Sequence, residues 1–359
     1  MNMGEEEKNG QGEQALSMIT TPGRKTSTAA TTPTGGIEGP AEGATNSEVV
    51  ATRGRVRLLH YMPTTNRSLR VPILFVYALI NRYYILDIQP DRSVVRKYLD
   101  RGLDAYIIDW GYPRRVDRYE RIEDYIEYID EFVDLIRERS GSESVNLHGY
   151  CIGGTFCAIY SAMYPEKVNS LVIQAAPIDF STNAGVLNIW AKHIDADKVV
   201  DTLGNVPASF LNTSFLLVSP ARLLIDKYVN FYENAADENY VQSFMRMERW
   251  IFQSPDLTGE FYREFIKDFY QKNKLVKNEF KMGASTVDLQ KITSPLLVIV
   301  ANDDNLVTPD STTPILELAS SKDRELLRFG GGHIGMSVSP SAHKKLWSQA
   351  AEWVATRSA

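Results

Sequence analysis

Residues 145–154 constrain the fold of this chain more than any other segment. They read Val-Asn-Leu-His-Gly-Tyr-Cys-Ile-Gly-Gly, a short apolar strand that leads into a glycine-rich turn, and a helix is expected to follow over residues 155–164. Glycines stand two residues before and two residues after Cys151. Because a residue without a side chain lets a strand and the next helix approach closely around a strained turn, the pattern predicts Cys151 at the tip of that turn.

The remainder of the chain predicts an α/β fold. Apolar residues recur at helical spacing from Ile122 to Ile136, and Ser140-Gly141 stops that helix. A second helix is expected over residues 92–102. Strands alternate with these helices, which indicates a mainly parallel sheet covered by helices on both faces. The expected strands span residues 72–77, 105–109, 145–148, 171–176, 295–301 and 325–329.

Two segments depart from this alternation. Residues 178–293 are helical in character and dense in aromatic residues, which predicts a mostly helical cap inserted into an α/β core of residues 51–177 and 294–359. Residues 1–50 hold 8 of the 23 glycines and no aromatic residue. Such a segment buries too little apolar surface to offset its ordering entropy, so we expect a disordered tail there.

Composition excludes several classes of protein. A net charge of −6 argues against a protein built mainly to bind nucleic acid. No apolar run reaches the 18 or so residues of a membrane-spanning helix, and the N-terminus lacks a secretory signal. Two cysteines make no disulfide framework, and no Cys/His cluster has the spacing of a zinc site. We therefore expect a cytoplasmic protein with no membrane span and no metal.

The turn at Cys151 resembles the nucleophile elbow of α/β-hydrolases, with Cys in place of Ser. A sulfur at the N-terminus of a helix is favoured as a thiolate by the helix dipole and the free N–H groups. The backbone N–H of Ile152 would point to where an oxyanion forms. Cys157 lies about 240° further around the same helix, so we expect a packed core thiol there.

A nucleophile in this fold is followed along the chain by an acid and then by a base. His333 suits the base because it stands in Gly-Gly-Gly-His-Ile-Gly, directly after an expected strand. Asp303 and Asp304 follow another expected strand, and the order of residues leaves both open as the acid. His148 precedes the acid along the chain, which is wrong for the base. The other histidines read as ordinary residues: His60, His193 and His343.

The choice of cysteine carries chemical information. A thiol that attacks a thioester exchanges one thioester for another, so the acyl group stays activated. A serine ester would be less activated. Cysteine therefore favours acyl transfer from a thioester donor.

Motifs over about residues 55–357 resemble the polyhydroxyalkanoate (PHA) synthases. The compact size and the segment Arg-Met-Glu-Arg-Trp resemble the class III catalytic subunits, although Asn305 stands where many relatives carry His. The long N-terminal tail is a second departure. The matching motifs occupy residues 80–88, 108–111, 149–154, 246–259, 265–271, 304–309 and 331–335.

The resemblance implies a polymerase that converts (R)-3-hydroxyacyl-coenzyme A, such as 3-hydroxybutyryl-coenzyme A, into polyester with release of coenzyme A. Cys151 would carry the acyl group, and His333, oriented by Asp304 rather than Asp303, would move the protons. The backbone N–H of Ile80 would be a second oxyanion donor. The family implies no metal or other cofactor, a second synthase subunit, a homo-oligomer and a place on the surface of polymer granules.

Two other functions remain open from the sequence. One is a cysteine hydrolase that resembles dienelactone hydrolase, or a thioesterase. The other is a silent α/β-hydrolase fold that acts as a granule scaffold. The intact set of Cys151, Asp304 and His333 speaks against the scaffold, because a silent relative would be free to lose any of them.

Overall fold

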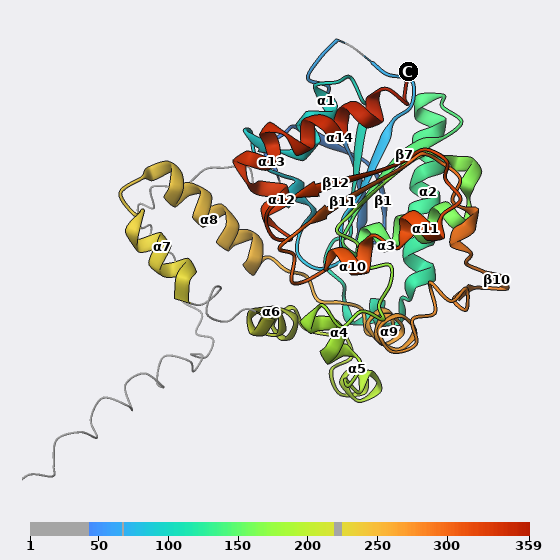
Figure 1. The fold of residues 1–359 in the computed structure, drawn as a ribbon, viewed down its shortest axis with the longest axis vertical. Coiled ribbons are helices and arrows are strands. Elements are labelled where there is room, and N and C mark those ends of the chain that lie inside the picture. The colour runs from blue at the N-terminus through green and yellow to red at the C-terminus, as the bar shows by residue number, and fades with distance from the viewer. Residues whose placement is uncertain (1–42, 67, 219–224) are drawn as a thin grey trace, which may run out of the picture. The chain divides into compact units, whose positions relative to one another are not determined.

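The computed structural model describes residues 43–66, 68–218 and 225–359, which contain a central sheet of eight strands (Figure 1). The order across the sheet is β1-β2-β6-β3-β7-β8-β11-β12. β2 pairs antiparallel with both neighbours, and the other neighbouring strands are parallel, which confirms the predicted fold class. The strands are β1 (Ser47–Arg53), β2 (Val56–Tyr61), β3 (Ile73–Val76), β6 (Ala105–Asp109), β7 (Val145–Tyr150), β8 (Val168–Gln174), β11 (Leu296–Ala301) and β12 (Arg324–Phe329).

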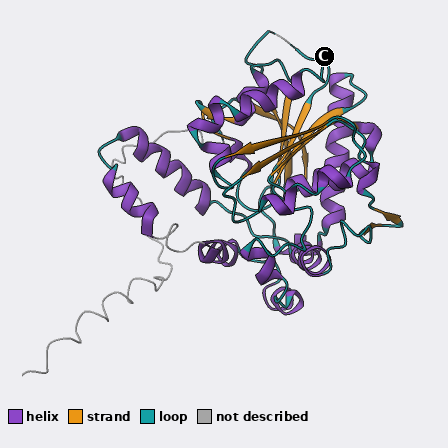
Figure 2. Ribbon diagram, viewed as in Figure 1, coloured by secondary structure: helices purple, strands orange, loops and turns teal. Residues whose placement is uncertain are grey.

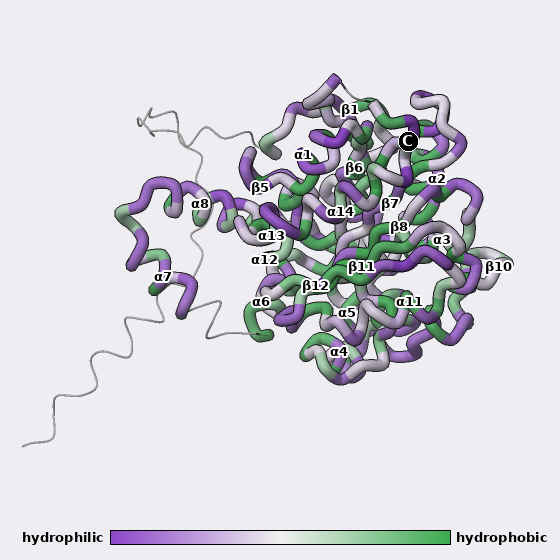
Figure 3. The backbone as a smooth tube through the Cα atoms, turned by 45° about the horizontal axis from the view of Figure 1, so that its top comes forward, coloured by the Kyte–Doolittle hydropathy of each residue, from purple (hydrophilic) through white to green (hydrophobic). Residues whose placement is uncertain are grey.

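Helices cover both faces of the sheet (Figure 1). One pair of packed helices is α1 and α14, and another is α2 and α3. The central strands between them are hydrophobic (Figure 3), and every residue of β3, β6, β7 and β11 is buried. These helices are α1 (Val94–Leu99), α2 (Ile122–Ser140), α3 (Ile152–Met163) and α14 (Leu346–Ala355).

Consecutive residues of β7 show which helices lie on which face. The imidazole of His148 lies against Tyr98 of α1 and Trp347 of α14, at ring-centroid distances of 5.6 and 5.8 Å. Gly149 instead abuts Gly154 of α3. Because successive residues of a strand point to opposite faces, α1 and α14 lie on one face and α3 lies on the other.

The chain between β8 and β11 is mostly helical (Figure 2). A π-helix over Phe265–Gln271 continues α9, and two short strands, β9 (Lys281–Met282) and β10 (Ser285–Thr286), follow. The role of residues 178–293 as a cap stays a prediction. The helices in this region are α4 (Val186–Ala191), α5 (Ala196–Leu203), α6 (Ala208–Val218), α7 (Lys227–Glu233), α8 (Glu238–Phe252) and α9 (Gly259–Glu264).

The predicted tail needs a correction at its end. Residues 1–42 lie outside the described part of the chain, but residues 47–50 belong to β1, which pairs with β2 along its length. An edge strand of this kind is held by backbone hydrogen bonds and needs no aromatic residue. Composition alone therefore placed the boundary of the tail too late.

One helix is shorter than predicted. The helix expected over residues 92–102 begins at Val94, after the two-residue strand β5 (Arg92–Ser93), because the Ser93 hydroxyl caps it by accepting from the Arg96 N–H at 3.0 Å. His343 lies on α13 (Pro340–Lys344), directly before α14. The remaining elements are β4 (Asp87–Gln89), α10 (Pro309–Thr312), α11 (Ile315–Leu318), α12 (Gly335–Val338) and short 3₁₀ turns at Tyr83–Leu86, Arg115–Tyr119, Pro165–Lys167 and Leu289–Lys291.

Within the ranges that the structure describes, no helix is both long and apolar enough to cross a membrane.

Candidate active site

Cys151 lies between β7 and α3 in a conformation that few side-chain-bearing residues adopt, with φ 56° and ψ −128°. Glycine makes this turn possible. A Cβ at Gly149 would lie 2.4 Å from the Cα of Gly154, and a Cβ at Gly153 would lie 2.0 Å from the carbonyl oxygen of Val76. The strained, tightly packed turn predicted from the glycine spacing is present, and it leaves the thiol only half-buried at the start of α3.

Asp304 and His333 meet across the ends of two neighbouring strands. Asp304 follows β11 and His333 follows β12, and the imidazole Nδ1 lies 2.6 Å from the Asp304 Oδ2. The other carboxylate oxygen of Asp304 accepts from the backbone N–H groups of Leu306 and Val307, both at 2.9 Å. Asp304 is therefore fixed in one orientation, whereas the neighbouring Asp303 is exposed.

The contact with Asp304 sets the charge of His333. Burial by itself disfavours an imidazolium and is the largest single influence. The charge of Asp304, the nearby Tyr150 and Cys151 and the hydrogen bond to Asp304 together outweigh it and raise the pKa of His333 well above its ordinary value. Because Cys151 contributes to this rise, the thiol lies within electrostatic reach of the ring. Because Nδ1 donates to Asp304, Nε2 is the nitrogen left to serve another group.

One candidate oxyanion donor belongs to the elbow itself, and the other belongs to the loop after β3. Ile152 is the first residue of α3, where a backbone N–H has no partner within the helix. Ile80 lies in the loop after β3, the strand that pairs with β7 at the elbow, with Val76 opposite Gly149. The backbone of Val76 and Tyr77 passes directly over Gly153. The use of either N–H as an oxyanion donor stays a prediction.

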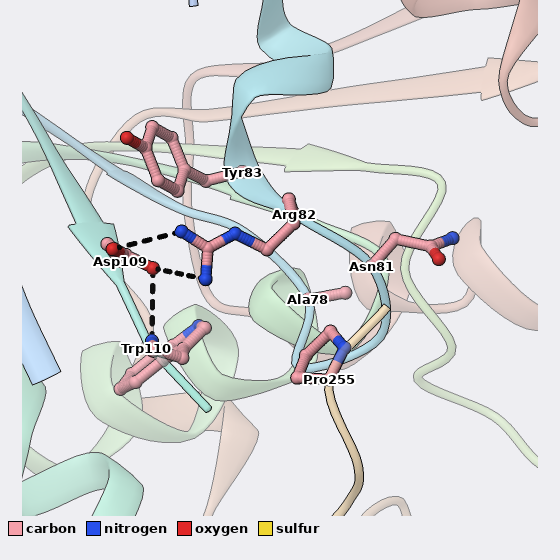
Figure 4. Close-up of a pocket in the computed structure, with 8 residues that line it drawn as sticks. Ala78, Asn81, Arg82, Tyr83, Asp109, Trp110 and Pro255 are labelled. Atoms are coloured by element: carbon pink, nitrogen blue, oxygen red, sulfur yellow. Dashed lines mark hydrogen bonds and ion pairs between the residues drawn. The ribbon is translucent and has the colours of Figure 1, made fainter. Parts of the chain in front are cut away.

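A buried ionic cluster supports this loop, which the sequence alone did not reveal. Asp109 accepts from Arg82 at 3.2 and 3.3 Å and from the backbone N–H of Gly111 at 3.0 Å, and Figure 4 shows the guanidinium turned onto the carboxylate. Arg57 also binds Asp109, at 2.6 Å. The indole N–H of Trp110 donates to the Tyr77 carbonyl at 2.9 Å. These contacts tie the loop after β3 to the end of β6.

The other reactive residues have structural surroundings. Cys157 is fully buried, and burial raises its thiol pKa, which confirms the expected core thiol. His60 lies on β2 beside Asp104, His193 is exposed, and the Nε2 of His343 lies 2.8 Å from a backbone carbonyl oxygen. Among the residues that the structure describes, no three His, Cys, Asp or Glu side chains gather as metal ligands would.

Tyr150 is a contact residue that sequence reasoning missed. Its hydroxyl donates to the backbone carbonyl of His333 at 2.8 Å, and its ring lies 5.0 Å from the imidazole. Only its place beside Cys151 in the glycine-rich turn marked it. Nothing in the sequence shows that a loop 183 residues later meets it.

Comparisons with known proteins agree with this geometry. Residues 71–340 match the family described as alpha/beta hydrolase fold, and residues 38–99 match the one described as poly-beta-hydroxybutyrate polymerase (PhaC) N-terminus. A soluble variant of monoglyceride lipase from Saccharomyces cerevisiae superposes with a TM-score of 0.56 at 13% identity, over 88% of this chain and 96% of that chain. That likeness shows the fold alone.

Curated relatives are much closer in sequence. The poly(3-hydroxyalkanoate) polymerase subunit PhaC of Haloferax mediterranei is 45% identical over 88% of this chain, which spans 65% of that relative's length. The subunit of the same name from Allochromatium vinosum is 46% identical over 80% of this chain and 81% of its own. The chain therefore belongs to the PhaC subunits of the poly(3-hydroxyalkanoate) polymerases, within the α/β-hydrolase fold.

Proposed function

We propose that this chain polymerises (R)-3-hydroxyacyl-coenzyme A into polyester through an acyl group carried on Cys151. The observation that supports this most directly is the half-buried thiol on a strained elbow, within electrostatic reach of an imidazole that Asp304 holds at 2.6 Å. The names of the relatives supply the class of reaction, and 3-hydroxybutyryl-coenzyme A is the substrate that we propose first.

In the first half-reaction the Cys151 thiol gives its proton to Nε2 of His333, and the thiolate attacks the carbonyl carbon of the thioester. Asp304 stabilises the imidazolium that forms. The backbone N–H groups of Ile152 and Ile80 stabilise the oxyanion. The C–S bond to coenzyme A then breaks, the imidazolium returns its proton to the departing thiolate, and the acyl group remains on Cys151.

In the second half-reaction the hydroxyl of a second 3-hydroxyacyl group attacks the thioester on Cys151. His333 takes the hydroxyl proton as the new ester C–O bond forms, and it returns that proton to the thiolate of Cys151 as the acyl–sulfur bond breaks. The chain is longer by one unit and the enzyme is regenerated. The cycle balances without a metal or a redox cofactor, so we propose that none takes part.

The printed names of the relatives call them subunits, which supports a second synthase subunit beside this chain. We further propose that the chain assembles with copies of itself and works at the surface of its own polymer granule. Both proposals can be tested by purification from a cell that accumulates polyester, with the chain expected in the granule fraction.

The deciding experiment measures coenzyme A release from (R)-3-hydroxybutyryl-coenzyme A by the wild type and by Cys151→Ala, alone and with a candidate second subunit. Polyester formation that Cys151→Ala abolishes would support the proposal. Release with only free 3-hydroxybutyrate would indicate the hydrolase or thioesterase alternative. If a folded protein releases no coenzyme A in any condition, the granule-scaffold alternative would be favoured. The relatives' names favour neither alternative.

A further inference from the structure

Tyr150 connects the candidate nucleophile to the candidate base. It is the last residue of β7, so it is covalently joined to Cys151, and its hydroxyl donates to the backbone carbonyl of His333 at 2.8 Å. The phenol is fully buried, and its ring lies 5.0 Å from the imidazole at an interplanar angle of 31°. A shift of the His333 loop relative to the elbow would therefore break a buried hydrogen bond.

A chain of buried hydrogen bonds ends beside the phenol. The Gln174 amide Nε2 donates to the Ser337 hydroxyl at 3.0 Å, and the Ser337 side chain lies close enough to the phenol of Tyr150 to offset part of the rise in its pKa. At the far end the Gln174 Oε1 accepts from Nε2 of His148 at 2.9 Å. His148, Gln174, Ser337 and Tyr150 are all fully buried.

The first two donors point the same way, from His148 to Gln174 and from Gln174 to Ser337. An amide oxygen can only accept, so Nε2 of His148 carries the proton. Burial lowers the pKa of His148 to about 4 and raises the pKa of Tyr150 to about 12, so both groups are neutral at neutral pH. Bonds that align in this way polarise one another and favour a single arrangement.

The loop that carries His333 needs such an anchor. A Cβ at Gly330 or Gly335 would meet nothing within 4 Å, so the loop is not wedged in place by its neighbours there. Gly331 has φ 143°, a backbone conformation that favours glycine, and its carbonyl accepts from the Asp303 N–H at 3.0 Å. The carboxylate of Asp304 fixes the imidazole ring of His333. The backbone carbonyl of His333 is held separately, by the hydroxyl of Tyr150.

We propose that Tyr150 is a positioning residue, which sets the distance and orientation of His333 relative to Cys151. This inference rests on the proposed function of Cys151 and His333. It assigns Tyr150 no contact with the substrate. Tyr150→Phe should therefore lower kcat for coenzyme A release by about tenfold, the order expected when one hydrogen bond that orients a base is lost, and leave KM for the thioester unchanged.

A readout independent of polymer formation is the rate at which iodoacetamide alkylates Cys151 between pH 5 and pH 10. Cys157 is buried and should not compete. His333→Gln defines the profile of a thiol without its imidazole. The pH profile of alkylation for Tyr150→Phe should lie between those of the wild type and His333→Gln. The profile for Ser337→Ala should lie between those of the wild type and Tyr150→Phe.

The matched control is Tyr98→Phe. Tyr98 is also a fully buried tyrosine, its ring lies 5.6 Å from that of His148, and its hydroxyl has no hydrogen-bond partner among the described residues. Loss of this hydroxyl should leave kcat and the alkylation profile unchanged within about twofold. A role of Tyr150 in folding alone would change Tm but neither the profile nor kcat.

Two results would overturn the proposal. A wild-type profile and kcat for Tyr150→Phe, while His333→Gln changes both, would refute the positioning role and leave the proposed function standing. A His333→Gln profile equal to that of the wild type would refute the proposed base, and the positioning role with it. If Tyr150→Phe does not fold, Ser337→Ala decides, because it keeps the phenol and removes only the hydroxyl that lies close to it.

Discussion

Two glycine-rich turns carry the reacting residues, and glycine has a different role in each. At the elbow over residues 149–154, added Cβ atoms at Gly149, Gly153 and Gly154 would come within 2.0 to 2.4 Å of neighbouring atoms. In the loop over residues 330–335, added Cβ atoms at Gly330 and Gly335 would meet nothing within 4 Å. The elbow uses glycine to make room, and the loop uses it for backbone freedom.

This difference separates stability from function. Close packing of β3, β7 and α3 fixes Cys151, so a change at the elbow should cost folding free energy. His333 itself is instead held by two side chains, the carboxylate of Asp304 and the phenol of Tyr150, while backbone hydrogen bonds hold Gly331 and Gly332 beside it. A change in either side chain should cost activity more than stability.

The largest expected effect comes from Asp304→Asn. The amide can no longer balance an imidazolium and would favour the wrong tautomer of His333, so kcat should fall by about 10³- to 10⁴-fold. The matched control is Asp303→Asn, one residue earlier and exposed, which should keep kcat within about twofold. Coenzyme A release measures both. Equal losses in the two variants would contradict the assignment of Asp304.

Gly153→Ala should break the elbow. Its Cβ would lie 2.0 Å from the carbonyl oxygen of Val76 and 2.8 Å from the carbonyl carbon of Tyr77, and both are backbone atoms that cannot swing aside. We expect a loss of about 3 kcal/mol or more in the free energy of unfolding, measured by urea denaturation. Gly335→Ala, where a Cβ has open space, is the control. Wild-type stability of Gly153→Ala would mean that the elbow packs less tightly than described.

The sequence predicted the elbow because its constraint is local. Glycine spacing, an apolar strand and an apolar helix within 20 residues define the turn. β7 runs two residues further than predicted and α3 begins three residues earlier, so the turn is tighter than expected but lies at the predicted place. The long helix α2 was likewise readable, from its apolar spacing and from Gly141, which ends it with φ 68°. Patterns of this kind depend on neighbours in the chain.

Other features depend on partners far along the chain. The residues alone left Asp303 and Asp304 open, because only contact with His333, 29 residues away from Asp304, separates them. The carbonyl anchor at Tyr150 spans 183 residues, and the pair formed by Arg82 and Asp109 follows from the packing of two strands. Residue type and spacing along the chain do not indicate contacts between residues so far apart in the sequence.

The buried chain of hydrogen bonds that ends beside Tyr150 should make stability depend on pH. The pKa of His148 is lowered by burial to about 4 from its usual 6.5 or so. The neutral form that the fold requires is therefore fully available above pH 6.5. Its contribution is lost as pH falls toward 4, because the unfolded chain binds a proton that the folded chain excludes. Between pH 7 and pH 5 this costs about 2 kcal/mol.

Urea denaturation of the wild type and of His148→Leu at both pH values isolates this residue. In the variant Gln174 lacks its hydrogen bond to His148 at both pH values. The free energy lost with that bond therefore cancels when the two pH values are compared. The wild type should lose about 2 kcal/mol more than the variant when the pH falls from 7 to 5. If the wild type and the variant lose equal free energy of unfolding, His148 is not held neutral. The assigned direction of the hydrogen bonds that begin at His148 would then be wrong.

The smallest effects should come from two adjacent glycines in the loop of His333. Gly330 has open space for a Cβ and no positive φ, so Gly330→Ala should raise the free energy of unfolding by about 0.4–1 kcal/mol by restricting the unfolded chain. Gly331 has φ 143°, and a Cβ there would lie 2.8 Å from the ring of Phe329, so Gly331→Ala should lower it. Opposite signs at neighbouring positions would show that the loop accepts a side chain at Gly330 but not at Gly331, where the backbone conformation and the ring of Phe329 both oppose it. If both variants lose the same free energy of unfolding, the loop is as tightly packed as the elbow, and the two turns do not differ in the role of glycine.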